Sequence, residues 1–164
     1  MIHVYTGNGK GKTTAAIGLA IRAFGRGKKV AMIQFMKNGR YGEITALRAL
    51  GIEVEQFGRA EFVDREKPDR EDIELAEKAL ERAEKLVCEC DLLVLDEINV
   101  AVDYGLIALE RVLDLIVRAG NTELVLTGRY AREEVIDRAD YVTEMREIKH
   151  PYSRGVEARE GVEF

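Results

Sequence analysis

Residues 6–14 read TGNGKGKTT and combine glycines, lysines and threonine hydroxyls in the manner of a phosphate-binding loop. Glycines let backbone N–H groups turn inward around phosphate oxygens, while a lysine adds positive charge and a hydroxyl ligates Mg²⁺. The P-loop pattern is G-x-x-x-x-G-K-[ST], and residues 11–13 (GKT) complete it. However, Thr6 takes the place of the first glycine, and Gly7 and Gly9 follow it. The stretch therefore indicates either a hydrolase loop with displaced glycines or a loop that holds its nucleotide differently.

A second group of residues suited to this chemistry lies in LLVLDE, residues 92–97, where four apolar residues precede two acids. This is the form of a Walker B strand, and a carboxylate at the C-terminal end of a parallel strand faces the ligand crevice. We therefore expect Asp96 to hold Mg²⁺ through water and Glu97 to activate a nucleophile. Arg129, in LTGR at the end of a later strand, is expected to point into the same crevice.

The elements that must position these residues alternate between strands and helices. Continuous apolar runs indicate strands covered on both faces, and the six runs are Ile2–Tyr5, Lys29–Phe35, Glu53–Phe57, Asp91–Leu95, Glu123–Leu126 and Tyr141–Met145. Helical spacing separates most of them, at Thr13–Phe24, Asp69–Val87, Leu106–Arg118 and Arg132–Arg138. The first of these helices is apolar nearly all round and is expected to be buried, with Gly25 and Gly27 ending it.

This alternation predicts an α/β fold with a mainly parallel sheet of about six strands and right-handed crossovers. A strand precedes the glycine-rich loop and a helix follows it, which favours a P-loop over an incidental glycine-rich turn. No repeat, linker or low-complexity tract divides the chain. Residues 1–164 are therefore expected to form a single domain with a P-loop NTPase (RecA-like) fold.

Composition excludes several classes of protein. With 46% apolar residues, 34% charged residues and only two prolines, the chain is expected to fold compactly. A net charge of -5 argues against a nucleic-acid-binding protein, which needs a basic face. No apolar run approaches eighteen residues and no signal peptide precedes the first strand, so we expect no membrane insertion and a cytoplasmic protein. Cys88 and Cys90 are interpreted as ordinary reduced cysteines, because a tetrahedral metal site needs four suitably spaced ligands.

Further motifs extend the pattern along nearly the whole chain. From about residue 3 to the C-terminus they are, in order, TGNGKGKTTAA, QFMKNG followed by GE, VLDE, LTGR and ADYVTE…IKHPY…GVEAREGVEF. In these motifs the chain resembles the ATP:corrinoid adenosyltransferases of cobalamin biosynthesis and salvage. Members of that family bind ATP across the P-loop in reversed polarity compared with hydrolases, which fits the altered glycine spacing.

The resemblance implies an alkyl transfer in which a Co(I) corrinoid attacks C5′ of the ATP ribose and expels inorganic triphosphate. Because Co(I) is itself a strong nucleophile, the protein needs to position C5′ and stabilise charge on the leaving group. The implied catalytic residues are Lys12, Thr13, Glu97 and Arg129, with Mg²⁺ held by Thr13, Asp96 and Glu97. The implied ATP-binding residues are Thr6, Gly7, Asn8, Gly9, Lys10, Gly11, Lys12, Thr13, Thr14 and Arg129, joined by Lys149 and His150 unless these two merely form a charged strand end.

Phe62, in RAEFVDRE, matches one of the two aromatic residues in the family's corrinoid region, and the second is replaced near Asp64. Phe62 is therefore either a corrinoid contact or a residue that caps the core. Some members carry an N-terminal extension over the active site, whereas the first strand here begins at residue 2. We thus expect a more exposed corrinoid or a partner subunit that covers it. The resemblance also implies a homodimer and an electron-donating reductase or flavoprotein as partner.

Two rival functions fit the loop and the acids. A RecA-like Mg-ATPase would use Glu97 to polarise a water onto the γ-phosphate, with Arg129 as a sensor or finger. A regulatory module would bind the nucleotide without turnover. Both leave the C-terminal KHPY…GVEF motif unexplained. Analysis of what happens to ATP distinguishes the three functions. An ATPase forms ADP and phosphate, a regulatory module leaves ATP unchanged, and an adenosyltransferase releases triphosphate.

Overall fold

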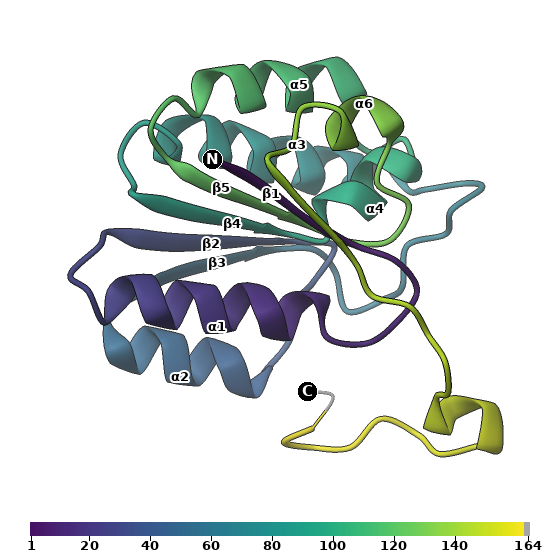
Figure 1. Cartoon of the computed structure of the whole chain (residues 1–164). Helices are drawn as coiled ribbons and strands as arrows, with labels where there is room; N and C mark the ends of the chain where they lie inside the picture. The colour runs from purple at the N-terminus through teal and green to yellow at the C-terminus, as the bar shows by residue number, and fades with distance from the viewer. Residues whose placement is uncertain (163–164) are drawn as a thin grey trace.

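The computed structural model describes residues 1–162 and consists of a six-stranded sheet covered by helices on both faces (Figure 1). All neighbouring strands are parallel, in the order β3-β2-β4-β5-β1-β6. The strands are β1 Ile2–Thr6, β2 Val30–Phe35, β3 Glu53–Phe57, β4 Leu92–Asp96, β5 Glu123–Thr127 and β6 Tyr141–Glu144. The helices are α1 Lys12–Phe24, α2 Gly42–Leu50, α3 Arg70–Leu86, α4 Ile98–Asp103, α5 Leu109–Arg118 and α6 Glu133–Ile136, followed by the 3₁₀ helix η1 Pro151–Arg154. The predicted fold class is confirmed.

The connections place α1 and α2 on one face of the sheet and α3 to α6 on the other (Figure 1). The chain runs outward from β1 to β2 and β3, then returns across the sheet to β4 and β5. Right-handed crossovers in opposite directions put the connecting helices on opposite faces. Loops at the carboxyl ends of the strands therefore diverge where the direction reverses, and ligands of open α/β sheets bind there.

Strands β2 and β4 are neighbours inside the sheet, and every residue in both is buried. Their continuous apolar runs are explained by helices packing on both sides, as predicted. The larger cluster of buried side chains lies under α3, α4 and α5, and the smaller one lies under α1 and α2. The core thus fixes the two strands whose ends carry Gln34 and Asp96.

Three expectations about the elements were wrong in part. Helix α1 buries only Lys12, Ala16 and Ala20, because it is an outer-layer helix with one face in solvent. Helices α2 and α4 were not predicted: both are short, and a six-residue apolar helix such as α4 resembles a strand in sequence. Strand β6 is exposed along its whole length because it lies at the edge of the sheet, beside β1 only.

His3 and the two cysteines have surroundings that fit structural roles. The imidazole of His3 bonds the carboxylate of Glu123 at 2.7 Å and stacks on Tyr141, a structural role that agrees with its position at the strand start. Cys88 is exposed and Cys90 is buried, and both thiols are free. Across residues 1–162, none of the helices is sufficiently long and apolar to cross a bilayer.

The glycine-rich loop after β1 packs against the backbone that leaves β6. The amide of Gly9 donates to the carbonyl oxygen of Met145 at 2.6 Å, and the amide of Met145 donates to Thr6 O at 2.8 Å. A Cβ on Gly7 or Gly9 would lie 2.6 Å from the Met145 oxygen, and Gly7 also has a φ of +92°. The displaced glycines are therefore required for close approach of the C-terminal segment to the loop.

Substituting Gly9 and Gly18 with alanine should change stability in opposite directions. Gly9→Ala forces the loop and residues 145–146 apart, and overpacking of this kind typically costs about 1–3 kcal/mol. Gly18, in α1, has open space around its Cβ position, so Gly18→Ala should add about 0.5–1 kcal/mol through lower unfolded-state entropy. Urea unfolding of both variants measures this difference. Equal stability of the Gly9→Ala variant and the unsubstituted protein would contradict the packing role.

Candidate active site

A cavity of about 870 Å³ opens at the carboxyl edge of the sheet, within the size range of ligand sites. The glycine-rich loop forms one wall, residues between β2 and α2 a second, and the segment after β6 a third. Its lining residues are Asn8, Gly9, Lys10, Gly11, Lys12, Thr13, Thr14, Ile17, Lys37, Tyr41, Gly42, Glu43, Glu97, Arg129, Glu147, His150, Tyr152, Ser153, Gly161 and Val162. A smaller polar hollow adjoins it and shares Asn8, Arg129 and Glu147.

Lys12 begins α1 and its ammonium is held inside the loop. Its Nζ donates to the carbonyl oxygens of Gly7 and Gly9, each at 2.7 Å. Burial lowers the pKa of Lys12, and the charge of Arg129 adds to this, whereas Glu97 and Asp96 oppose it. The first turn of α1 adds backbone N–H groups without intrahelical partners. Together they form a positively polarised site for phosphate oxygens.

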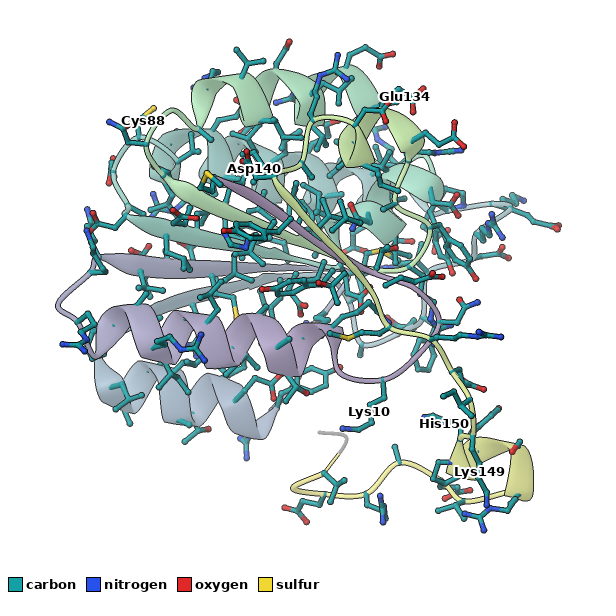
Figure 2. All side chains as sticks on the ribbon, in the orientation of Figure 1. Lys10, Cys88, Glu134, Asp140, Lys149 and His150 are labelled. Atoms are coloured by element: carbon teal, nitrogen blue, oxygen red, sulfur yellow. The ribbon has the colours of Figure 1, made fainter. Side chains whose placement is uncertain are left out.

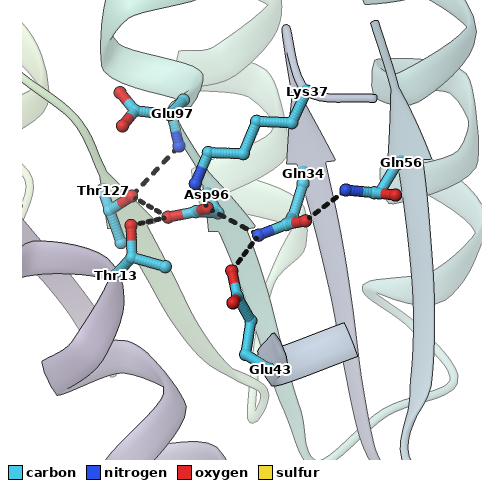
Figure 3. A network of polar contacts seen from close by, with 8 residues as sticks. All are labelled: Thr13, Gln34, Lys37, Glu43, Gln56, Asp96, Glu97 and Thr127. Atoms are coloured by element: carbon cyan, nitrogen blue, oxygen red, sulfur yellow. Dashed lines mark hydrogen bonds and ion pairs between the residues drawn. The ribbon is translucent and has the colours of Figure 1, made fainter. Parts of the chain in front are cut away.

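The carboxylate of Asp96 lies at the centre of a buried polar network (Figure 3). Its Oδ1 accepts from Thr13 Oγ1 at 2.8 Å and from Thr127 Oγ1 at 2.7 Å. Its Oδ2 accepts from Gln34 Nε2 at 3.0 Å and from Lys37 Nζ at 2.7 Å. A carboxylate has about four acceptor positions, and four donors fill them here.

This network has a consequence for a metal ion. The Thr13 hydroxyl donates its hydrogen bond to Asp96, which leaves the lone pairs of the hydroxyl oxygen for a cation in the cavity that Thr13 and Glu97 line. Within residues 1–162, no group of three or more His, Cys, Asp or Glu side chains gathers as a metal site. Mg²⁺ commonly takes one or two protein oxygens and completes its shell with phosphate and water. The oxygen donors here fit that mode, with Asp96 orienting Thr13.

Glu97 reaches the cavity because of an uncommon backbone conformation. Its φ of 66° lies in the left-handed region, and it directly precedes α4. Its amide donates to Thr127 Oγ1 at 3.0 Å, so the same threonine holds both neighbouring acids. Burial raises the pKa of Glu97, and the adjacent Asp96 charge adds to this, whereas Lys37, Lys12 and Arg129 oppose it.

The structure gathers most of the predicted site residues around the cavity. Those that line it are Asn8, Gly9, Lys10, Gly11, Lys12, Thr13, Thr14, Glu97, Arg129 and His150. Thr6, Gly7, Asp96, Lys149 and Phe62 lie outside its lining, although Gly7 holds Lys12 and Asp96 holds Thr13. The Thr6 hydroxyl accepts from the Ala131 amide at 3.3 Å. In Figure 2, Lys10 projects from the loop on the side of the molecule where the segment after β6 carries Lys149 and His150.

Sequence reasoning missed the wall between β2 and α2. Lys37, Tyr41 and Glu43 line the cavity, and Lys37 also contacts Asp96. A signal was present, because QFMKNG follows a strand that was predicted to end at the same edge as Asp96. Tyr152 and Ser153 were also missed, although the KHPY motif that contains Tyr152 had led to the prediction that its neighbours Lys149 and His150 bind ATP.

The loop that carries Phe62 is held at both ends. Arg59 pairs with Asp72 at 2.8 Å and with Asp69 at 2.6 Å, at the start of α3. Arg65 pairs with Asp103 at 2.9 Å. Phe62 itself is 102% exposed. The alternative that it caps the core is wrong, because the ring lies in solvent and packs against neither cluster of buried side chains in the described part of the chain.

Comparisons with known proteins agree with the site. The chain matches the family described as ATP:corrinoid adenosyltransferase BtuR/CobO/CobP over residues 1–164. A corrinoid adenosyltransferase of Pseudomonas aeruginosa is 42% identical over 166 residues, covering 98% of this chain and 82% of the relative. Corrinoid adenosyltransferase CobA of Salmonella typhimurium is 36% identical over 169 residues, covering 100% and 85%, and a corrinoid adenosyltransferase of Escherichia coli is 34% identical with the same coverage.

The last two residues of the C-terminal GVEF motif lie outside the described residues, but the remaining motifs surround one cavity. The RecA-like ATPase alternative is not favoured, since the matched family includes the C-terminal segment that an ATPase leaves unexplained. With the fold, the phosphate-binding loop and full-length similarity in agreement, the chain belongs to the ATP:corrinoid adenosyltransferases, a family of transferases that act on ATP and a corrinoid.

Proposed function

We propose that this chain transfers the 5′-deoxyadenosyl group of ATP to the Co(I) of a corrinoid and releases inorganic triphosphate. The observation that carries this proposal is the concentration of cationic side chains around one cavity. Lys10, Lys12 and Arg129 line it beside the first turn of α1. A triphosphate leaving group gains negative charge as the C5′–O bond breaks, and these groups can stabilise that charge.

The cavity supports a reaction in which the substrate supplies the nucleophile. Ser153 and His150 both line it, but the Ser153 hydroxyl donates to the backbone carbonyl oxygen of His150 at 2.7 Å. Nδ1 of His150 accepts from the amide of Tyr152 at 3.2 Å. The two side chains therefore do not form a serine–histidine pair. This agrees with a reduced corrinoid as nucleophile, for which the protein needs only positioning and charge stabilisation.

The protein residues divide these tasks. Lys12, Lys10 and Arg129 bind phosphate oxygens, and the loop accepts ATP with its triphosphate in the reversed direction. Thr13 and Glu97 would hold Mg²⁺, which supplies positive charge to the triphosphate when bound. Asp96 acts through Thr13 by accepting the hydrogen bond of its hydroxyl group, which orients the hydroxyl oxygen. His150 lines the cavity and contacts the nucleotide, and its sequence neighbour Lys149 adds positive charge.

Several finer features belong to the same proposal. The acceptor is cobyrinic acid a,c-diamide or salvaged cobalamin, the electron donor is a reductase or flavoprotein, and the enzyme works as a cytoplasmic homodimer with one catalytic domain over residues 1–164. Analysis of ATP products tests the central reaction. Incubation with a pre-reduced corrinoid should yield triphosphate in equal amount to adenosylated corrinoid. Accumulation of ADP and phosphate, without adenosylation, would refute it.

Lys12→Ala should abolish transfer without unfolding the protein. Loss of one preorganised charge contact to the leaving group costs about 3–4 kcal/mol, or roughly 10²–10³ in kcat. Lys29→Ala is a matched control, because Lys29 is an exposed lysine that pairs with Glu89 at 3.7 Å. Turnover near that of the unsubstituted enzyme at saturating Mg-ATP would exclude this loop as the triphosphate site.

Glu97→Gln should slow the reaction mainly by weakening Mg-ATP binding, because attack by cobalt requires no deprotonated water. Higher Mg²⁺ concentration should then restore part of the rate. The measurement is KM for Mg-ATP and kcat across a range of Mg²⁺ concentrations. A large decrease in kcat at saturation, with unchanged Mg²⁺ and ATP affinity, would instead support a role as general base.

Phe62→Ala should retain Mg-ATP binding and alkylate pre-reduced Co(I), but fail from Co(II) with a mild reductant. An apolar ring against the lower face of the corrinoid excludes an axial ligand, and four-coordinate cobalt is easier to reduce. Full exposure leaves the Phe62 ring free to make such a contact. Electron paramagnetic resonance of the Co(II) complex with Mg-ATP should show a four-coordinate signal that the variant lacks.

A control for this experiment is Val117→Ala, because Val117 is another exposed apolar side chain, 76% exposed on α5. It should leave both the signal and the rate from Co(II) unchanged. Equal rates from Co(II) for Phe62→Ala and the unsubstituted enzyme would remove Phe62 from the corrinoid site.

A further inference from the structure

Lys37 is a cavity-lining cation whose charge is paired with a buried acid. Its Nζ lies 2.7 Å from Asp96 Oδ2, and its side chain is 18% exposed. Burial alone would lower the pKa of Lys37, but Asp96 and, more weakly, Glu97 and Glu43 reverse this and raise the pKa. Lys37 therefore stays charged, and that charge faces both the protein interior and the cavity.

The backbone of Lys37 is fixed, so movement at this position is confined to the side chain. The Met36 amide donates to Phe57 O at 2.8 Å, and Met36 has a φ of 58°. A Cβ on Gly58 would collide with the backbone of Met36 and Lys37. The four-carbon stem of Lys37 then runs from a rigid base toward Asp96 (Figure 3), and its Nζ also lies 5.6 Å from the centre of the Tyr41 ring.

The four donors to Asp96 differ in their freedom to leave it. Gln34 and Thr127 are fully buried, and Thr13 is fixed in the first turns of α1. Lys37 alone among them carries a charge and has a long flexible stem. A cation bound at Thr13 and Glu97 would repel the Lys37 ammonium. It would also replace Lys37 as the positive charge that compensates Asp96. Because phosphate oxygens enter the same cavity with that cation, a new partner for the ammonium is then present.

We propose that Lys37 is a mobile counter-charge that pairs with Asp96 in the free enzyme and turns to the triphosphate when Mg²⁺ and nucleotide bind. It thus adds a phosphate-binding cation to those of the loop and prevents Asp96 from remaining uncompensated between turnovers. This inference rests on the proposed function, since it assigns the triphosphate to this cavity. An unpaired buried carboxylate is costly, which explains why a lysine occupies this position in the absence of ligand.

The test measures binding of two simple ligands, Mg²⁺ alone and inorganic tripolyphosphate with Mg²⁺, by titration calorimetry. Lys37→Met keeps the stem and removes the charge. Its affinity for Mg²⁺ alone should rise about tenfold, because no ammonium competes for the acids, and its affinity for tripolyphosphate should fall roughly tenfold to a hundredfold through loss of one charged contact. A purely structural role predicts no such opposite changes. Two unchanged affinities, or two weakened ones, would overturn the proposal.

Two controls separate the possible failures. Lys28→Met removes an exposed lysine that pairs with Asp91 at 3.4 Å, and it should change neither affinity. If the unsubstituted enzyme does not bind tripolyphosphate, the proposed function fails and not only the role of Lys37. If Lys37→Met does not fold, NMR spectra of the unsubstituted enzyme with ¹³C-labelled lysine replace the titration. The Lys37 resonance is the one that is missing from the spectrum of Lys37→Arg. That resonance should shift when tripolyphosphate and Mg²⁺ are added together, and no shift would contradict the proposal.

Discussion

The buried carboxylate of Asp96 is the constraint on which the rest of the site depends. A charge with no exposed surface must be compensated by donors, and these come from β2, α1, β5 and the segment after β2. Satisfying one side chain therefore fixes α1, the end of β2 and β5 relative to β4, although these parts of the chain are distant in sequence. The same network orients the Thr13 hydroxyl and, through Thr127, holds the backbone of Glu97. The contacts that compensate the Asp96 charge therefore also position the residues of the site.

The contact between the glycine-rich loop and the segment after β6 has a comparable role at the other wall. Gly9 donates to Met145, and both Gly7 and Gly9 leave no room for a side chain there. The spacing of glycines in this loop thus reflects contact with the C-terminal segment in addition to phosphate binding. That contact also carries the chain toward His150 and Tyr152, which line the cavity together with Lys37 and Tyr41.

The loop between β3 and α3 is held by ion pairs near the protein surface. Its charged residues form ion pairs with α3 and α4, while Phe62 remains exposed. The ion pairs of Arg59 and Arg65 hold the loop on either side of Phe62 and leave its apolar ring at the surface. An exposed aromatic on a fixed loop suits contact with a large planar ligand, since less conformational entropy is lost on binding than for a mobile loop.

By itself, the sequence determined the α/β class, the six strands to within a residue or two, and the positions of the glycine-rich loop and of the two acids that end β4 and follow it. These follow from local patterns, because continuous apolar runs, glycine spacing and the position of acids after a strand depend on neighbouring residues only. Only the tertiary structure decided that Asp96 is saturated by four donors, that Lys37 and Tyr41 belong to the cavity, and that Phe62 is exposed. The four contacts to Asp96 join residues 31 to 83 positions apart, and the exposure of Phe62 depends on how the whole loop packs, so no local pattern encodes them.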